Sequence, residues 1–190
     1  MSHSREDVIS AAGRLFARDG YHGTSMRDLG RELGLLGSSL YSHVEGKQEL
    51  LVAVVERGAE FFQASADAAL AAEGPASERL RRLIEGHLGV ILDHRDEVRT
   101  YLNEARSLEP ASRERIVAAR DRYEQAFRTV LKEGVADGSF RADVDPKLAG
   151  IFVLSILNAV DRWYEEDGRL DRTALASRIA DMVERGLRTG

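Results

Sequence analysis

Residues 34–50 read GLLGSSLYSHVEGKQEL and separate two short apolar-periodic segments from a much longer one. Two Gly, three Ser, one Tyr and one His stand among the eleven residues from Gly34 to Val44. A polar loop at residues 45–46 then leads into the long run, which begins at Lys47. Because side chains of this kind make little hydrophobic core, we interpret the stretch as a surface element that contacts another molecule.

Two short helices are predicted before this stretch. Ser-x-x-Asp patterns at residues 4–7 and 25–28 resemble capping boxes, with Asp in place of the usual Glu. Apolar residues recur at spacings of three and four after each pattern, and Gly20 and Gly34 end the two runs. A helix, a tight turn at Gly34 and a second short helix form the order of a helix-turn-helix, which places its second helix in the major groove of DNA.

The rest of the chain is also predicted to be helical, because apolar residues recur at three and four and no sustained alternation typical of strands is found. Further helices are expected from Lys47 to about Ala72 and from Ser77 to a boundary near Asp93. The next helix carries the apolar residues of 98–105 and runs up to the Glu109-Pro110 break, and a long one bears those of 116–131 and ends near Asp137-Gly138. The last two follow the Asp145-Pro146 cap and Asp171. We therefore expect an all-α protein of about nine helices. Residues 1–46 would form a helix-turn-helix DNA-binding domain, and residues 47–190 a ligand-binding and dimerisation domain.

Composition limits the classes of protein that fit. The 190 residues include no cysteine, which excludes disulfides, thiolate metal sites and thiol nucleophiles. No apolar stretch approaches the roughly 20 residues of a membrane span, and the first residues lack the apolar region of a secretory signal, so we expect a cytoplasmic protein with no membrane partner. The net charge is −5, and residues 1–50 hold six basic and seven acidic side chains. DNA binding must therefore depend on where charges lie and not on their sum.

Groups that bond to DNA phosphates gather in residues 24–47, and Lys47 adds its charge to the positive end of a helix dipole. The segments LFARDGYHGTSMRDLGRELGL (15–35) and SSLYSHVEGKQELL (38–51) resemble the DNA-binding segment of the TetR family of bacterial repressors. The match covers residues 5–52 and keeps its register through three helices and a loop. This resemblance implies an operator-binding protein whose DNA contacts come from Thr24, Ser25, Arg27, Ser38, Ser39, Tyr41, Ser42, His43 and Lys47.

One position departs from the family pattern. Where the family usually has a Ser N-cap followed by a polar residue, this chain has Leu36 and Gly37. Leucine offers no side-chain acceptor, so Gly37, Ser38 or the bare backbone must cap the helix, and Gly37 joins the predicted DNA-contacting residues. Two alternatives stay open: Tyr21 either packs between helices or reaches DNA, and His43 either binds phosphate or is partly buried.

The segment IFVLSILNAV at residues 151–160 is apolar nearly all round. A helix of this kind must be covered on both sides, by its own bundle and by a second subunit. We therefore expect a homodimer formed through this helix and the last one. The alternative is the central core helix of a monomer.

The family resemblance implies a pocket in residues 47–190 whose ligand weakens DNA binding, and apolar faces carrying a few polar groups suit such a site. Asn158 is the clearest candidate, because an amide within an apolar helix needs a partner or costs about 1–3 kcal/mol. A ligand, a buried water or the twofold partner would each supply that partner. The predicted ligand-binding residues are Phe62, His87, Tyr101, Tyr123, Phe127, Asn158, Arg162 and Trp163.

The segment NAVDRWYEEDGRLDR at residues 158–172 is similar to members of the family that govern fatty-acid or sterol breakdown and bind acyl-CoA thioesters. This likeness implies a small apolar effector such as an acyl-CoA, with Arg162 favoured for the anionic group. Uncharged aromatic ligands are the alternative. A second alternative for the whole chain is a helical small-molecule-binding or interaction protein without DNA binding.

Neither a metal site, a cofactor nor an enzymatic activity is expected. His87 and His94 could ligate a metal together with nearby carboxylates, but their spacing matches no tight motif and a helix boundary is predicted near His94. The sequence also holds no glycine-rich phosphate loop and no nucleophile elbow.

Overall fold

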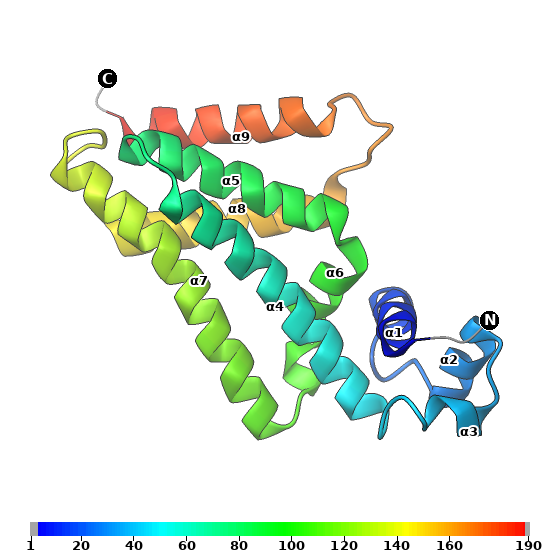
Figure 1. The fold of residues 1–190 in the computed structure, drawn as a ribbon. Helices are drawn as coiled ribbons and strands as arrows, with labels where there is room; N and C mark the ends of the chain where they lie inside the picture. The colour runs from blue at the N-terminus through cyan, green and yellow to red at the C-terminus, as the bar shows by residue number, and fades with distance from the viewer. Residues whose placement is uncertain (1–3, 189–190) are drawn as a thin grey trace. The chain divides into compact units, whose positions relative to one another are not determined.

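The computed structural model describes residues 4–188, and over this range it contains helices and no strand (Figure 1). The prediction of an all-α protein is therefore confirmed. A 3-10 helix, η1 (Ala105–Ser107), follows α6. The α-helices are α1 (Arg5–Asp19), α2 (Met26–Leu33), α3 (Gly37–Leu40), α4 (Lys47–Ala71), α5 (Ala76–Asp93), α6 (Arg95–Glu104), α7 (Pro110–Ala136), α8 (Pro146–Trp163) and α9 (Arg172–Leu187).

Both predicted capping boxes are confirmed at the starts of α1 and α2. The Ser4 hydroxyl accepts a hydrogen bond from the Asp7 backbone N–H at 3.2 Å, and the Ser4 N–H donates to the Asp7 carboxylate at 2.7 Å. Gly34 ends α2 in the left-handed conformation, with φ 64° and ψ 27°, which is the helix stop that glycine supplies without strain.

The predicted recognition helix is short. Leu36 stands at its N-cap, where the backbone oxygen of Leu36 accepts hydrogen bonds from the N–H groups of Ser39 and Leu40 at 2.9 and 3.4 Å. The regular helix ends at Leu40, and residues 41–43 continue as a turn in which the Val44 N–H donates to the Leu40 oxygen at 3.2 Å. Leu36 has no side-chain acceptor, so this residue contributes only its backbone oxygen to the start of the helix.

Two compact units divide the chain: Met1–Glu60 with His94–Ala118, and Phe61–Asp93 with Ala119–Gly190. The first unit contains α1–α3 and α6, together with the beginnings of α4 and α7. The predicted division between a DNA-binding domain (residues 1–46) and a ligand-binding and dimerisation domain (residues 47–190) is a functional one, and it stays a prediction.

In the first unit, α1 packs against α2 and α6 (Figure 1). Its core includes Phe16, Leu29, Leu40 and Val54, each at most 2% exposed. Helices α4 and α6 approach closely at Gly58, where an added Cβ would lie 2.9 Å from the Tyr101 Cβ. The glycine therefore allows α6 to lie directly against α4.

In the second unit, α5 packs against both α8 and α9 (Figure 1). The α8 helix buries Val153, Leu157 and Val160 on one side. Its other side leaves Leu148, Phe152 and Ile156 exposed at intervals of four residues, beside a groove of about 460 Å³ that α9 also lines. No helix within residues 4–188 combines the length and the apolar character that crossing a membrane requires.

Candidate functional site

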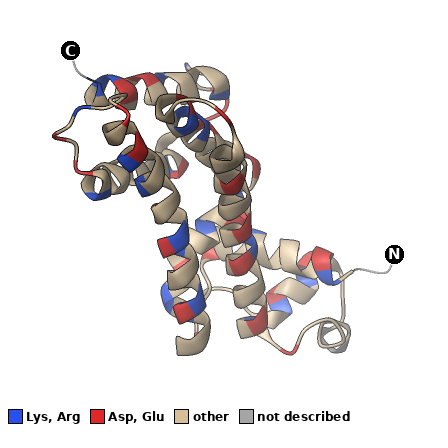
Figure 2. Ribbon diagram, turned by 60° about the vertical axis from the view of Figure 1, so that its left-hand side comes forward, with Lys and Arg blue, Asp and Glu red and all other residues tan. Residues whose placement is uncertain are grey.

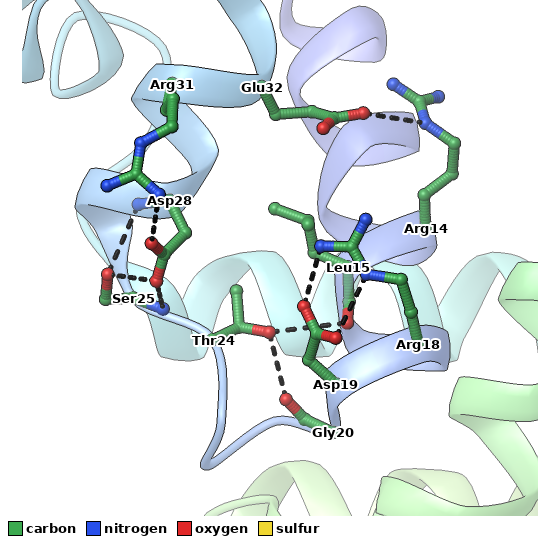
Figure 3. Close-up of polar contacts among 10 residues, drawn as sticks. All are labelled: Arg14, Leu15, Arg18, Asp19, Gly20, Thr24, Ser25, Asp28, Arg31 and Glu32. Atoms are coloured by element: carbon green, nitrogen blue, oxygen red, sulfur yellow. Dashed lines mark hydrogen bonds and ion pairs between the residues drawn. The ribbon is translucent and has the colours of Figure 1, made fainter.

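Thr24 fastens the turn between α1 and α2. Its side chain is 3% exposed, and its hydroxyl lies 3.0 Å from the Gly20 carbonyl oxygen and 3.3 Å from that of Leu15 (Figure 3). The hydroxyl is thus occupied inside the protein, and the predicted contact between Thr24 and DNA stays a prediction.

Ser25 is exposed at the start of α2 and exchanges hydrogen bonds with Asp28. These bonds, first of all the one from the Ser25 hydroxyl, hold the pKa of the Asp28 carboxyl below its ordinary value. Asp28 also pairs with Arg31 at 3.4 Å (Figure 3). A charged carboxylate therefore sits beside the helix start that is predicted to meet DNA.

Basic side chains of this region are largely neutralised by neighbouring carboxylates. Between residues 4 and 60, the described structure pairs five of seven with an acidic side chain, and Figure 2 shows the two signs mixed along the helices. The pairs are Arg5–Glu49, Arg14–Glu32, Arg18–Asp19, Arg31–Asp28 and Arg57–Glu6.

The two basic side chains left without an ion pair in this described range are Arg27 and Lys47. Arg27 is exposed in the first turn of α2, and Lys47 is the first residue of α4. Both belong to the predicted DNA-contacting set. Because a phosphate gains most from a cation that no carboxylate already neutralises, these two side chains are the best placed to bind the DNA backbone.

Around α3, the predicted contact residues differ in exposure. Tyr41 is 58% exposed, Ser42 is exposed, and Ser39 and His43 are half-buried. The Ser42 hydroxyl donates to the Ser39 backbone oxygen at 2.7 Å. Tyr41 and the two residues after it belong to the turn that follows α3. The predicted DNA contacts of Gly37 and Ser38 stay predictions.

Tyr21 packs against other residues of the protein, as one of the two alternatives for this residue predicts. Its hydroxyl donates to the Gln48 Oε1 at 2.7 Å, and the Lys47 Nζ lies 4.1 Å from the centroid of its ring. The Gln48 Nε2 in turn donates to the Ser107 backbone oxygen at 3.3 Å. The sequence analysis missed Gln48, because no motif marks an amide whose partners come from distant segments.

Four of the predicted ligand-binding residues form an aromatic cluster in the second unit. Phe62 comes from α4, His87 from α5, and Tyr123 and Phe127 from α7. Ring centroids lie 4.7 Å apart for Phe62–His87, 5.3 Å for Phe62–Tyr123 and 5.6 Å for Tyr123–Phe127. All four side chains are at most 6% exposed, so the cluster is part of the core of this unit.

His87 brings a polar group into this cluster. Its Nδ1 lies 2.9 Å from the Tyr123 hydroxyl, and among the described residues no hydrogen-bond partner reaches its Nε2. Burial lowers the pKa of His87 from 6.5 to about 3, and the nearby Asn158 side chain partly opposes this shift. The ring is therefore neutral at physiological pH.

Asn158 lies near His87, and the other three predicted ligand-binding residues lie elsewhere. Asn158 is half-buried on α8, whereas Arg162 and Trp163, at the end of α8, are exposed. Tyr101 belongs to the first unit, where it is 5% exposed. Their part in ligand binding stays a prediction. Within the described chain, no group of three or more His, Asp or Glu side chains is arranged to hold a metal ion.

Two family models match the chain. The model for bacterial regulatory proteins of the tetR family matches residues 8–54, and the model for the tetracyclin repressor-like C-terminal domain matches residues 73–187. The transcriptional repressor KstR2 of Mycolicibacterium smegmatis is 27% identical over 184 residues, which cover 96% of this chain and 90% of the relative.

Solved structures show the same likeness along nearly the whole chain. PfmR, a TetR family transcriptional regulator from Thermus thermophilus, is 35% identical with a TM-score of 0.87, over 96% of this chain and 99% of PfmR. AibR, in complex with isovaleryl coenzyme A and operator DNA, is 26% identical with a TM-score of 0.83, over 96% of this chain and 97% of AibR.

Proposed function

Because the chain belongs to the TetR family of bacterial regulatory proteins, we propose that it is a ligand-responsive transcriptional repressor that binds a near-palindromic operator as a homodimer. Its relatives are transcriptional regulators, a class without enzymatic activity. The proposal rests on one observation: Arg27 and Lys47, at the starts of the helices that flank α3, have no ion pair within the described residues 4–60. In an acidic protein, these charges direct the helix-turn-helix toward phosphate.

DNA binding is tested by gel shift with duplex DNA from the region flanking the chain's own gene, since such repressors commonly lie beside their targets. We expect a retarded complex that weakens steeply as salt rises, because each neutralised phosphate releases counterions. Tyr41→Ala should weaken it while circular dichroism stays unchanged. If the protein binds small molecules but retards no duplex, the alternative of a helical ligand-binding protein replaces this proposal.

The effector that we propose is an acyl-CoA thioester. The structure of the relative AibR contains isovaleryl coenzyme A and operator DNA, and in this chain the acyl group would pack among the apolar side chains of the aromatic cluster in the core of the second unit. A neutral His87 can bond to a polar atom such as a carbonyl oxygen. Arg162 is exposed and has no ion-pair partner among the described residues, which suits an anionic head group.

The effector is tested by titrating acyl-CoAs of increasing chain length into the protein–DNA complex. Release of DNA should depend on chain length, and Arg162→Ala should reduce release while DNA affinity stays unchanged. Arg82→Ala, at an exposed arginine of α5, is the matched control and should release DNA as the wild type does. Release by an uncharged aromatic compound and by no acyl-CoA would overturn the acyl-CoA proposal.

The homodimer is proposed to form through α8 and α9. Phe152 is 62% exposed, Met182 53% and Leu148 49%, and all three line the groove between these helices. An exposed apolar surface of this kind marks a protein contact. A second copy of the chain is the partner that the near-palindromic operator requires, because a twofold operator matches a twofold protein.

A further inference from the structure

We infer that Tyr21 is a positioning residue for DNA binding: its ring holds the Lys47 ammonium in the place where that charge meets a phosphate of the DNA backbone. The inference rests on the proposed DNA-binding function and assigns a role to a residue outside the predicted contact set. Its basis is the distance of 4.1 Å between the Lys47 Nζ and the centroid of the Tyr21 ring. At this distance the negative face of the ring attracts a cation.

The Tyr21 ring is itself held on several sides. Phe16, which is 2% exposed, packs against it edge-on with ring centroids 5.5 Å apart. His22 packs against it with centroids 5.1 Å apart. The Tyr21 hydroxyl is anchored by Gln48, whose amide is anchored in turn by the Ser107 backbone oxygen. These contacts therefore restrict the orientation of the Tyr21 ring.

The Lys47 charge remains available for another partner. Within the described residues no carboxylate lies within ion-pair distance of its ammonium, although every arginine of residues 4–60 except Arg27 has one. Burial lowers the pKa of Lys47, and the charge of Glu104 opposes this effect. The Tyr21 ring faces one side of the Lys47 ammonium. The N–H donors on the other sides of the ammonium are free for phosphate oxygens.

Fixing this side chain before binding has an energetic consequence. A free lysine side chain has many rotamers, and ordering it on DNA costs conformational entropy. The Tyr21 ring restricts those rotamers in the free protein, so less entropy is lost when the phosphate is bound. Loss of the ring should therefore weaken DNA binding about two- to fivefold, the range expected for an exposed cation–π contact.

The test is a double-mutant cycle with a random-sequence DNA duplex, because phosphate contacts do not depend on base sequence. The variants are Tyr21→Leu, Lys47→Ala and the double variant, with Tyr21→Phe as the conservative control that keeps the ring. Tyr21→Leu should weaken binding in the wild-type background and have no further effect in the Lys47→Ala background. Tyr21→Phe should restore most of the affinity. The salt slope of Tyr21→Leu should match that of the wild type, because Lys47 still reaches the phosphate, whereas Lys47→Ala should make the slope shallower.

A second measurement does not require DNA. In the free protein, the ring current of Tyr21 should shift the Lys47 Hε resonances upfield in an NMR spectrum, and Tyr21→Leu should remove this shift. If Tyr21→Leu fails to fold by circular dichroism, Tyr21→Met takes its place in both measurements.

Three outcomes overturn the inference: an absent ring-current shift, an unchanged or higher DNA affinity of the Leu variant, or an equal loss in both Lys47 backgrounds. Failure of the proposed function is recognised separately, because then the wild type itself binds no duplex while the upfield shift is still present.

Discussion

The Nδ1 of His87 lies 2.9 Å from the hydroxyl of Tyr123, and both side chains are more than nine-tenths buried. Because burial lowers the pKa of His87 to about 3, this is a hydrogen bond between two neutral groups at physiological pH. The unfolded chain, in contrast, exposes the imidazole to water, where its ordinary pKa is 6.5. The difference between the two states links folding to pH.

The first prediction concerns this linkage. Below pH 6.5 His87 of the unfolded chain binds a proton, whereas folded His87 stays neutral down to about pH 3. The free energy of unfolding should therefore fall as pH drops from 6.5 to about 3. The slope from this group should approach 1.4 kcal/mol per pH unit, roughly the value for one proton. His87→Phe should flatten the dependence in urea unfolding, whereas Tyr123→Phe should keep it, because burial is the main cause of the shift. Equal slopes for wild type and His87→Phe would contradict this.

The second prediction compares an arginine that has no ion pair in the free protein with one that has. Arg27→Ala should reduce DNA affinity and lower the salt slope by about 0.9, the change expected for one lost phosphate contact. Arg31→Ala, on the same helix, removes a charge that is already paired with Asp28 and should leave the slope nearly unchanged. Fluorescence anisotropy at several salt concentrations measures both slopes. A larger change for Arg31→Ala than for Arg27→Ala would show that ion pairing in the free protein does not determine which cations bind phosphate.

Local sequence signals predicted the beginnings and ends of the helices well. Ser4 and Ser25 cap α1 and α2 as expected, and the Asp145 and Asp171 side chains accept backbone hydrogen bonds at the starts of α8 and α9. These signals succeed because a cap and its partners lie within four residues of one another.

Contacts between distant segments could not be predicted in the same way. No local signal in the sequence indicates that the folded α1–α2 turn buries the Thr24 side chain. Phe62, His87 and Tyr123 come from three helices, and no spacing in the sequence indicates that their rings meet. The exposed side of α8 was predicted from its continuous apolar composition, but which residues form that side depends on how α5 packs against it.

The third prediction concerns the N-cap of α3. Leu36 is 78% exposed and gives the helix no side-chain acceptor, so Leu36→Ser should stabilise the protein by about 0.5–2 kcal/mol, the range measured for such caps. Leu36→Ala also removes the exposed apolar side chain but adds no acceptor, and it should bring no comparable gain. Urea unfolding of the two variants measures the difference. Equal stabilities would indicate that the backbone already caps this helix fully.

The last prediction concerns the exposed side of α8. Phe152 is 62% exposed, so a charge at this position should leave the fold of each chain intact and should disrupt only the contact with a second copy. At a concentration where the wild type is a dimer, light scattering should show that Phe152→Glu is a monomer. Its circular dichroism spectrum should match that of the wild type. Because two recognition helices must lie about one DNA turn apart, roughly 34–36 Å, the monomer should also lose operator affinity.

Leu157→Glu is the matched control, because Leu157 belongs to the opposite, buried side of the same helix and is 0% exposed. A buried unpaired carboxylate costs far more than an exposed one, so this variant should unfold or aggregate and not yield folded monomers. The two variants therefore differ in which contact they break, although each adds the same charge to α8. A wild type that is already monomeric at micromolar concentration, or a Phe152→Glu variant that remains a dimer, would contradict dimerisation through this side of α8.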